Sequence, residues 1–263
     1  MLSKQRQEEL SDLAEFIANE YCPNNLIEPK IIAKKNNISY CYGNYENAFD
    51  GLLEHEFGDF HIYLNLDRLK HAHTPRTRFT FAHELGHYFI DEHRNSLLNG
   101  HTPSHPSFTD FSSKNPIELE ADFFAASLLL PKNRLLQDCF RRKFEFVLIE
   151  ELSQKYQTSI TATLLKFASI GNHPIMIVCL INNAVKWYKC SHDFPFKWLR
   201  KPLSKDTIAG EYFYDKTKYN EEIEVTANDW FENVWDNDVD RPFFEKCIYS
   251  DQHNFVLSIL WEL

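Results

Sequence analysis

The chain has 263 residues, 43% of them hydrophobic, and a formal net charge of −10. It can therefore form one large or two modest globular domains, and the charge disfavours a broad basic surface for duplex DNA. No apolar run is long enough to span a bilayer, and residues 1–9 lack a signal-peptide core. We expect a cytosolic protein with no membrane partner and, because its six cysteines form no Cys-x-x-Cys pair, with reduced thiols.

The first predicted elements are two helices and two strands. Apolar residues on one stripe predict a helix over residues 5–21, and a shorter helix fits residues 28–36. Residues 38–42 are typical of a strand, and residues 60–65 alternate apolar and polar side chains. Two interpretations of the strand at 60–65 stay open. It is either an edge strand that holds an extended peptide by β-augmentation or an ordinary edge strand facing water.

The most informative feature is His83-Glu84-x-x-His87. Side chains four residues apart lie on one face of a helix, so both imidazoles can bind one tetrahedral metal ion, for which we expect zinc. Glu84 lies beside them, where it can accept a proton from the attacking water without being a ligand. The pattern is that of a helical zinc hydrolase.

The residues around this motif predict a helix. Apolar residues recur at spacings of three and four, and Thr74-Pro75 provides a cap followed by proline in the first turn. Gly86 disfavours a helix by propensity. Between the two histidines, however, its missing side chain allows a strand, a second helix or a substrate to approach the metal.

Residues 94–115 are rich in Ser, Asn, Pro and His and have no sustained period. A loop of this length is often a lid or a binding loop. His101 and His105 within it are either stabilisers of a developing oxyanion, competitors for the metal or exposed loop histidines. Tyr88, directly after the motif, is a further candidate oxyanion donor.

A second helix is predicted from Pro116 to the residue before Pro131, with Asn115 as its cap. Glu118 and Asp122 lie four apart on one face, so Glu118 can supply the third metal ligand while Asp122 orients a ligand imidazole. Two alternatives stay open. Asn115-x-x-Glu118 is also a capping box, and Glu120 is a second candidate for the ligand.

Two blocks of the sequence, taken together, indicate a protein family far more specifically than the zinc motif alone. They are Arg76-x-Arg78-Phe79-Thr80-x-Ala82-His83-Glu84-Leu85-Gly86-His87 and Glu118-x-x-Ala121-Asp122-x-Phe124-Ala125-Ala126-x-Leu128-Leu129-x-Pro131. With these blocks the chain resembles the ImmA/IrrE metallopeptidases over about residues 25–170.

The resemblance implies an α+β fold with a zincin-like domain of the gluzincin type. By position it assigns the zinc ligands to His83, His87 and Glu118 and the catalytic base to Glu84. Asp122 stands where the family commonly has Asn or Asp. Family members that have been studied cleave a helix-turn-helix repressor and thereby switch on phage, mobile-element or stress genes.

Residues 146–156 and 160–168 are predicted helices joined by a short polar turn, which resembles a helix-turn-helix. A role in DNA recognition and a role as scaffold are both open. The second helix offers only Thr161, Thr163 and Lys166 as polar readers of bases, which favours the scaffold. Arg141-Arg142-Lys143 is a basic cluster before the first helix.

The predicted elements after residue 171 are mainly strands. Residues 175–190 and 243–261 are predicted hairpins, and residues 222–226 form another strand. All five tryptophans lie in this region, where they line a ligand pocket or fill an aromatic core. Some members of the family carry a GAF-like sensor domain here.

We therefore predict a zinc metallopeptidase domain at residues 1–140, a helix-turn-helix-like segment at 141–171 and an antiparallel α+β regulatory domain at 172–263. The predicted function is a zinc-dependent endopeptidase that cleaves a cognate helix-turn-helix repressor to derepress phage, mobile-element, defence or stress genes. Single-stranded DNA or a small molecule is the candidate activator. The alternatives are a non-catalytic zinc-fold module that binds a repressor or DNA, and a zinc hydrolase with another substrate.

Overall fold

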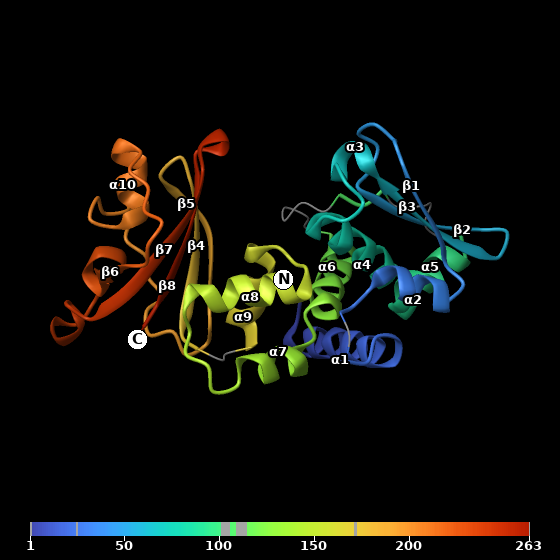
Figure 1. Ribbon diagram of the computed structural model, residues 1–263, viewed down its shortest axis with the longest axis horizontal. Coiled ribbons are helices and arrows are strands. Elements are labelled where there is room, and N and C mark those ends of the chain that lie inside the picture. Colours follow the sequence, from blue (N-terminus) through green and yellow to red (C-terminus); the bar gives the residue numbers. More distant parts are fainter. Residues whose placement is uncertain (1, 25, 101–105, 109–114, 171–172, 263) are drawn as a thin grey trace. The chain divides into compact units, whose positions relative to one another are not determined.

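The computed structural model describes residues 2–24, 26–100, 106–108, 115–170 and 173–262 (Figure 1). It has a mixed α+β fold made of two compact units. The first unit comprises residues 1–138 and 151–163, and the second comprises residues 139–150 and 164–263. The predicted division into domains at residues 140 and 171 stays a prediction. No helix in the described part of the chain combines the length and the apolar character that crossing a membrane requires.

The sheet of the first unit has three strands in the order β1-β3-β2. Strand β1 (Ser39–Gly43) pairs parallel to β3 (Asp59–Asn65), and β2 (Gly51–Glu56) pairs antiparallel to β3. The expectation that residues 60–65 form an edge strand is therefore wrong. The strand was recognised from its alternation, but its central position depends on pairing with two neighbours, and β2 lies at the edge instead.

Six helices of the described residues lie wholly in this unit, and a seventh, α7, lies there except for its last residue. They are α1 (Lys4–Tyr21), α2 (Pro29–Lys35), α3 (Leu66–Leu69), α4 (Pro75–Phe89), α5 (Asp91–Leu98), α6 (Pro116–Leu129) and α7 (Lys132–Cys139). The predicted helices at 5–21, 28–36 and around the histidine motif are all present.

Helix α5 corrects the prediction of a loop over residues 94–115. The helix runs to Leu98, with Asp91 and Glu92 in its first turn, where acidic side chains interact favourably with the helix dipole. The predicted loop is therefore wrong over residues 94–98. Its histidines, His101 and His105, lie outside the described residues.

Helices α4 and α6 pack against each other in the core of this unit. A Cβ atom added at Gly86 would lie 3.1 Å from Cδ1 of Phe124 and 3.2 Å from the Cα atom of Ala121. Of the three partners that the missing side chain allows, the second helix is thus the one observed. This close approach carries the first turn of α6 towards the histidines of α4.

Helices α8 (Phe146–Tyr156) and α9 (Ile160–Ile170) agree with the predicted helix pair. Thr163, one of the proposed base readers, is buried, and its hydroxyl lies 2.8 Å from that of Thr158. A buried hydroxyl with a protein partner cannot contact a base without rearrangement. This observation favours the scaffold interpretation of the pair.

The second unit contains a five-stranded antiparallel sheet in the order β5-β4-β8-β7-β6. Its strands are β4 (Ile175–Ile181), β5 (Ala184–Cys190), β6 (Ile223–Thr226), β7 (Pro242–Ser250) and β8 (Phe255–Trp261). Both predicted hairpins are present. Asn182 and Asn183 turn the first with φ of 51° and 59°, as a two-residue hairpin of type I′ requires. Helices α10 (Ile208–Asp215) and α11 (Ala227–Trp230) were not predicted.

The tryptophans of this unit have different environments. Trp230 and Trp261 are buried, and Trp230 lies in a core cluster with Phe231 and Phe243. Trp198 and Trp235 are 68% and 80% exposed. The aromatic-core interpretation therefore holds for Trp230 and Trp261, but it does not account for the two exposed rings.

Glu245 is a fully buried carboxylate on β7. Burial raises its pKa, and the donors around it oppose that rise. Its two oxygens accept five hydrogen bonds, from the backbone amides of Ile208 and Ala209, the indole of Trp230, the hydroxyl of Ser258 and the thiol of Cys247. One side chain thus connects the start of α10, α11 and two strands.

We expect Glu245→Gln to lower the free energy of unfolding of the second unit by about 2–4 kcal/mol, because an amide NH₂ would face donors that need an acceptor. Urea unfolding followed by tryptophan fluorescence measures this unit, since all five tryptophans lie in it. Glu224→Gln, at an exposed position of β6, is the control and should change little. Equal stability of the two variants would contradict the role assigned to Glu245.

Candidate metal centre

Helix α4 presents the two motif histidines on one buried face. The Thr74 side chain caps the helix by accepting a hydrogen bond from the Thr77 amide at 3.1 Å, and Pro75 occupies the first turn. The imidazoles of His83 and His87 are buried, and their Nε2 atoms lie 3.1 Å apart. The predicted cap and the spacing of four residues therefore produce the expected pair of adjacent nitrogens.

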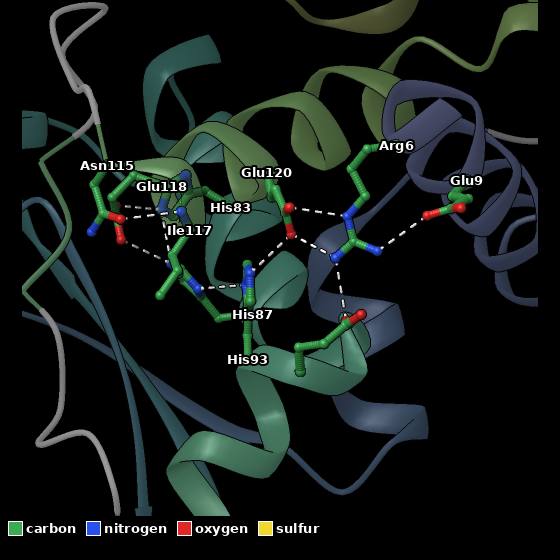
Figure 2. Close-up of polar contacts among 10 residues, drawn as sticks. Arg6, Glu9, His83, His87, His93, Asn115, Ile117, Glu118 and Glu120 are labelled. Atoms are coloured by element: carbon green, nitrogen blue, oxygen red, sulfur yellow. Dashed lines mark hydrogen bonds and ion pairs between the residues drawn. The ribbon is translucent and has the colours of Figure 1, made fainter. Parts of the chain in front are cut away.

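Helix α6 brings a carboxylate to this pair. Asn115 caps the helix by accepting a hydrogen bond from the Ile117 amide. The oxygens of Glu118 lie 3.2 Å from Nε2 of His83 and 3.5 Å from Nε2 of His87 (Figure 2). Glu118 is therefore placed where the ligand interpretation requires it.

The geometry of these three side chains fits a zinc ion. Two ligands of a tetrahedral zinc, each about 2.1 Å from the metal, lie about 3.4 Å apart. The two imidazole nitrogens lie 3.1 Å apart, and the carboxylate of Glu118 approaches them with one oxygen each, Oε2 at 3.2 Å from His83 and Oε1 at 3.5 Å from His87. Two histidines and one glutamate also form a donor set found in catalytic zinc sites, which leave a fourth position open. His83, His87 and Glu118 can thus hold a zinc ion.

Asp122 contacts the other nitrogen of His83. Its Oδ1 atom lies 2.9 Å from Nδ1 of His83, which is the contact needed to orient that imidazole. Burial lowers the pKa of His83, but the carboxylates of Asp122 and Glu118 outweigh it and raise the pKa to about 10. The two carboxylates that stabilise the protonated imidazolium of His83 would also stabilise a metal cation bound in place of the proton.

Glu84 is buried beside the three candidate ligands. Burial raises its pKa to about 7, while Ser107 and the backbone of Leu53 lower it. Among the described residues, neither of its oxygens has a hydrogen-bond partner of ordinary geometry. A buried carboxylate with a pKa near neutrality and an unoccupied hydrogen-bonding capacity is suited to proton transfer.

The edge strand β2 shapes the surroundings of Glu84. A Cβ atom at Gly51 would lie only 2.6 Å from Oε1 of Glu84, so this position accommodates glycine alone without a shift. The preceding residue, Asp50, is buried and holds Arg68 and Arg76 at 2.6 and 2.9 Å. These contacts anchor the start of β2 against the motif helix.

A cavity of about 420 Å³ opens onto Glu84 and His87. Its apolar walls are Leu53, Leu97, Pro116 and Ile117, and its other lining residues are Arg6, Glu92, His93, Ser96 and Glu120. The cavity is large enough for a side chain of a bound peptide, and it exposes the candidate base and one candidate ligand to that side chain.

The remaining predicted residues have other positions. Glu120, the second candidate for the third ligand, contacts Arg6 at 2.6 Å and His93 at 3.2 Å, away from the His83–Glu118 contact. Tyr88 packs edge-on against Phe60 and is not among the described residues that line the cavity. Its role as an oxyanion donor stays a prediction, and His105 lies outside the described residues.

His93 is a buried residue at this centre to which the sequence assigned no role. Its Nδ1 atom lies 3.2 Å from Nδ1 of His87, and burial lowers its pKa. The only feature of the sequence that could have pointed to His93 was its position six residues after His87. The sequence does not show that the chain turns between α4 and α5 so that the two rings meet.

The part of the chain that carries the candidate site matches a metallopeptidase family. Residues 63–167 match the family model described as an IrrE N-terminal-like domain (Peptidase_M78). This match confirms the resemblance to the ImmA/IrrE family that the two sequence blocks indicate.

A solved structure described as a Mycobacterium tuberculosis transcriptional regulator has a similar fold. The two chains are 12% identical with a TM-score of 0.59, and the match covers 97% of this chain and 76% of that one. At this identity the similarity concerns the fold alone. No curated protein shows a significant sequence match to this chain.

Proposed function

We propose that this protein is a zinc metallo-endopeptidase that cleaves a helix-turn-helix repressor and thereby derepresses phage, mobile-element, defence or stress genes. The observation that carries the proposal is the fully buried carboxylate of Glu84 beside the cluster of His83, His87 and Glu118. A site that only binds a partner has no need of such a base. The ImmA/IrrE domain supports the same class of activity.

In the proposed mechanism each residue has one task. Zinc, when bound, supplies a Lewis acid that polarises the scissile carbonyl and makes water a nucleophile at neutral pH. Glu84 accepts a proton from the attacking water and then delivers it to the leaving amine. Asp122 holds the ring of His83 through Nδ1, so that Nε2 points to the other candidate ligands.

The edge strand β2 is suited to bind the peptide. It is an outer strand of its sheet, starts beside Glu84 and contributes Leu53 to the cavity. Its first residue pairs with Ser107 through an isolated antiparallel bridge, so a neighbouring backbone already lies against the start of this edge. An extended substrate would add to the same edge by β-augmentation.

The proposed substrate and control are supported by charge and domain organisation. A net charge of −10 suits a partner with a basic surface, as DNA-binding repressors have. We further propose that residues 172–263, with their five-stranded antiparallel sheet, are a GAF-like regulatory domain that responds to single-stranded DNA or a small molecule. The similar fold of a chain described as a transcriptional regulator is consistent with this role.

The test is a cleavage assay with a helix-turn-helix protein found encoded beside this gene. We expect the zinc-loaded protein to cut it at a defined peptide bond, as measured by intact-mass spectrometry, and a chelator to stop the reaction. Stable binding of that protein without cleavage, with and without single-stranded DNA, would instead support a non-catalytic regulatory module.

A further inference from the structure

A continuous chain of polar contacts connects helix α1 to the metal centre (Figure 2). Arg6 on α1 binds both oxygens of Glu120, at 2.6 and 3.0 Å. Oε2 of Glu120 lies 3.2 Å from Nε2 of His93, and Nδ1 of His93 lies 3.2 Å from Nδ1 of His87. Side chains from α1, α4, α5 and α6 thus form one row of contacts.

The donors and acceptors of this row allow one arrangement of protons when a metal is held. His87 turns Nε2 towards His83 and Glu118, so its Nδ1 atom carries the hydrogen. Nδ1 of His93 must then accept that hydrogen, which leaves the hydrogen of His93 on Nε2. Glu120, an acceptor only, receives it. Each ring in the row is neutral and has a defined tautomer.

We propose that His93 is a positioning residue for the metal centre, which fixes the ring and the tautomer of His87, and that Glu120 and Arg6 hold His93 in that role. The inference rests on the proposed function, because it assumes that His87 is a zinc ligand. Partners of this kind orient a ligand histidine and raise its basicity.

The two candidate histidine ligands therefore have different partners at Nδ1. His83 contacts the carboxylate of Asp122 directly, at 2.9 Å. His87 contacts a neutral imidazole, and the carboxylate of Glu120 lies one ring further from the metal, paired with Arg6. This arrangement supplies an acceptor to His87 without placing a further carboxylate beside Glu84 and Glu118.

The position of the row gives it a second consequence. Arg6, His93 and Glu120 line the cavity that opens onto Glu84. Arg6, which lies 81 residues before His87 in the sequence, therefore contributes both to the cavity wall and to the support of a candidate ligand. A side chain bound in this cavity would lie against the residues that hold His87.

The first measurement is made on the zinc-loaded wild-type protein with ¹⁵N-labelled histidine. Two-bond ¹H–¹⁵N correlations report which ring nitrogen carries hydrogen. We expect His87 as the Nδ1–H tautomer and His93 as the Nε2–H tautomer. A hydrogen on Nδ1 of His93 would overturn the proposal. This result does not depend on whether any variant folds.

The second measurement is zinc affinity by chelator competition. His93→Phe fills the space but cannot accept from His87, so zinc binding should weaken about 10- to 100-fold. His93→Gln retains an acceptor and a donor and should weaken it less. His71→Phe, at an exposed position, is the control and should bind zinc as the wild type does. Circular dichroism checks that each variant is folded.

The outcomes separate this inference from the proposed function. Folded His93→Phe that binds zinc as tightly as the wild type would overturn the positioning role, even if the wild type binds zinc and cleaves its substrate. Failure of the wild-type protein itself to bind zinc would contradict both proposals.

Discussion

Glu84→Gln should reduce cleavage of the repressor by about 100- to 10,000-fold in kcat, the range typical for loss of a general base. Glutamine has nearly the same size and keeps the side chain in place beside Gly51, but it cannot accept the proton of the attacking water. Zinc content and thermal stability should remain close to those of the wild type. Initial rates under saturating substrate, with metal analysis of the same samples, measure the effect.

The matched control for this variant is Glu20→Gln, an exposed glutamate near the end of α1. It should cleave at the wild-type rate. If Glu84→Gln cuts as fast as this control, Glu84 is not the base and the proposed mechanism is wrong. If neither variant nor wild type cuts but all bind the repressor, the binding-module alternative gains support.

Glu118→Ala should weaken zinc binding by more than about 100-fold, a larger loss than removal of an outer partner causes. The reason is that Glu118 lies 3.2 and 3.5 Å from the two histidine nitrogens, where it completes the set of three ligands. Glu120→Ala should weaken zinc binding by at most about 10- to 100-fold, because Glu120 acts through His93. Chelator competition under identical conditions compares the two.

The order of these two effects is the decisive result. A larger loss of zinc in Glu120→Ala than in Glu118→Ala would transfer the ligand role to Glu120 and leave Glu118 as part of a helix cap. Simultaneous replacement of His83 and His87 by alanine should abolish zinc binding. Retention of zinc in that double variant would contradict the whole site.

Much of the local structure could be predicted because it depends on residues close together in the sequence. The caps at Thr74 and Asn115 start the two helices of the site as expected. The spacing of His83 and His87 alone places their nitrogens side by side, since a helix repeats every 3.6 residues. Asn182-Asn183 likewise identifies the turn of the first hairpin.

The structure corrected predictions that concern pairing between distant segments. Alternation identifies residues 60–65 as a strand, but the same pattern suits an edge or a centre, and only the pairing with β1 and β2 places β3 in the middle. The polar composition after residue 94 suggested a loop, whereas the chain continues α5 to Leu98. Weak local preferences yield to packing in such segments.

The sequence by itself determined the motif helix, the candidate base and the two histidines, because these follow from spacing within one helix. It left the third ligand open between Glu118 and Glu120, and only the packing of α6 against α4 brings Glu118 to the histidines. Only the tertiary structure decided how they are supported. Gly51 packs closely against Glu84, and Arg6 binds Glu120, which lies 114 residues later in the sequence. His93 meets His87 after a change of helix. These contacts join elements far apart in the chain, and burial, which raises the pKa of Glu84 to about 7, is a property of their packing rather than of any local pattern.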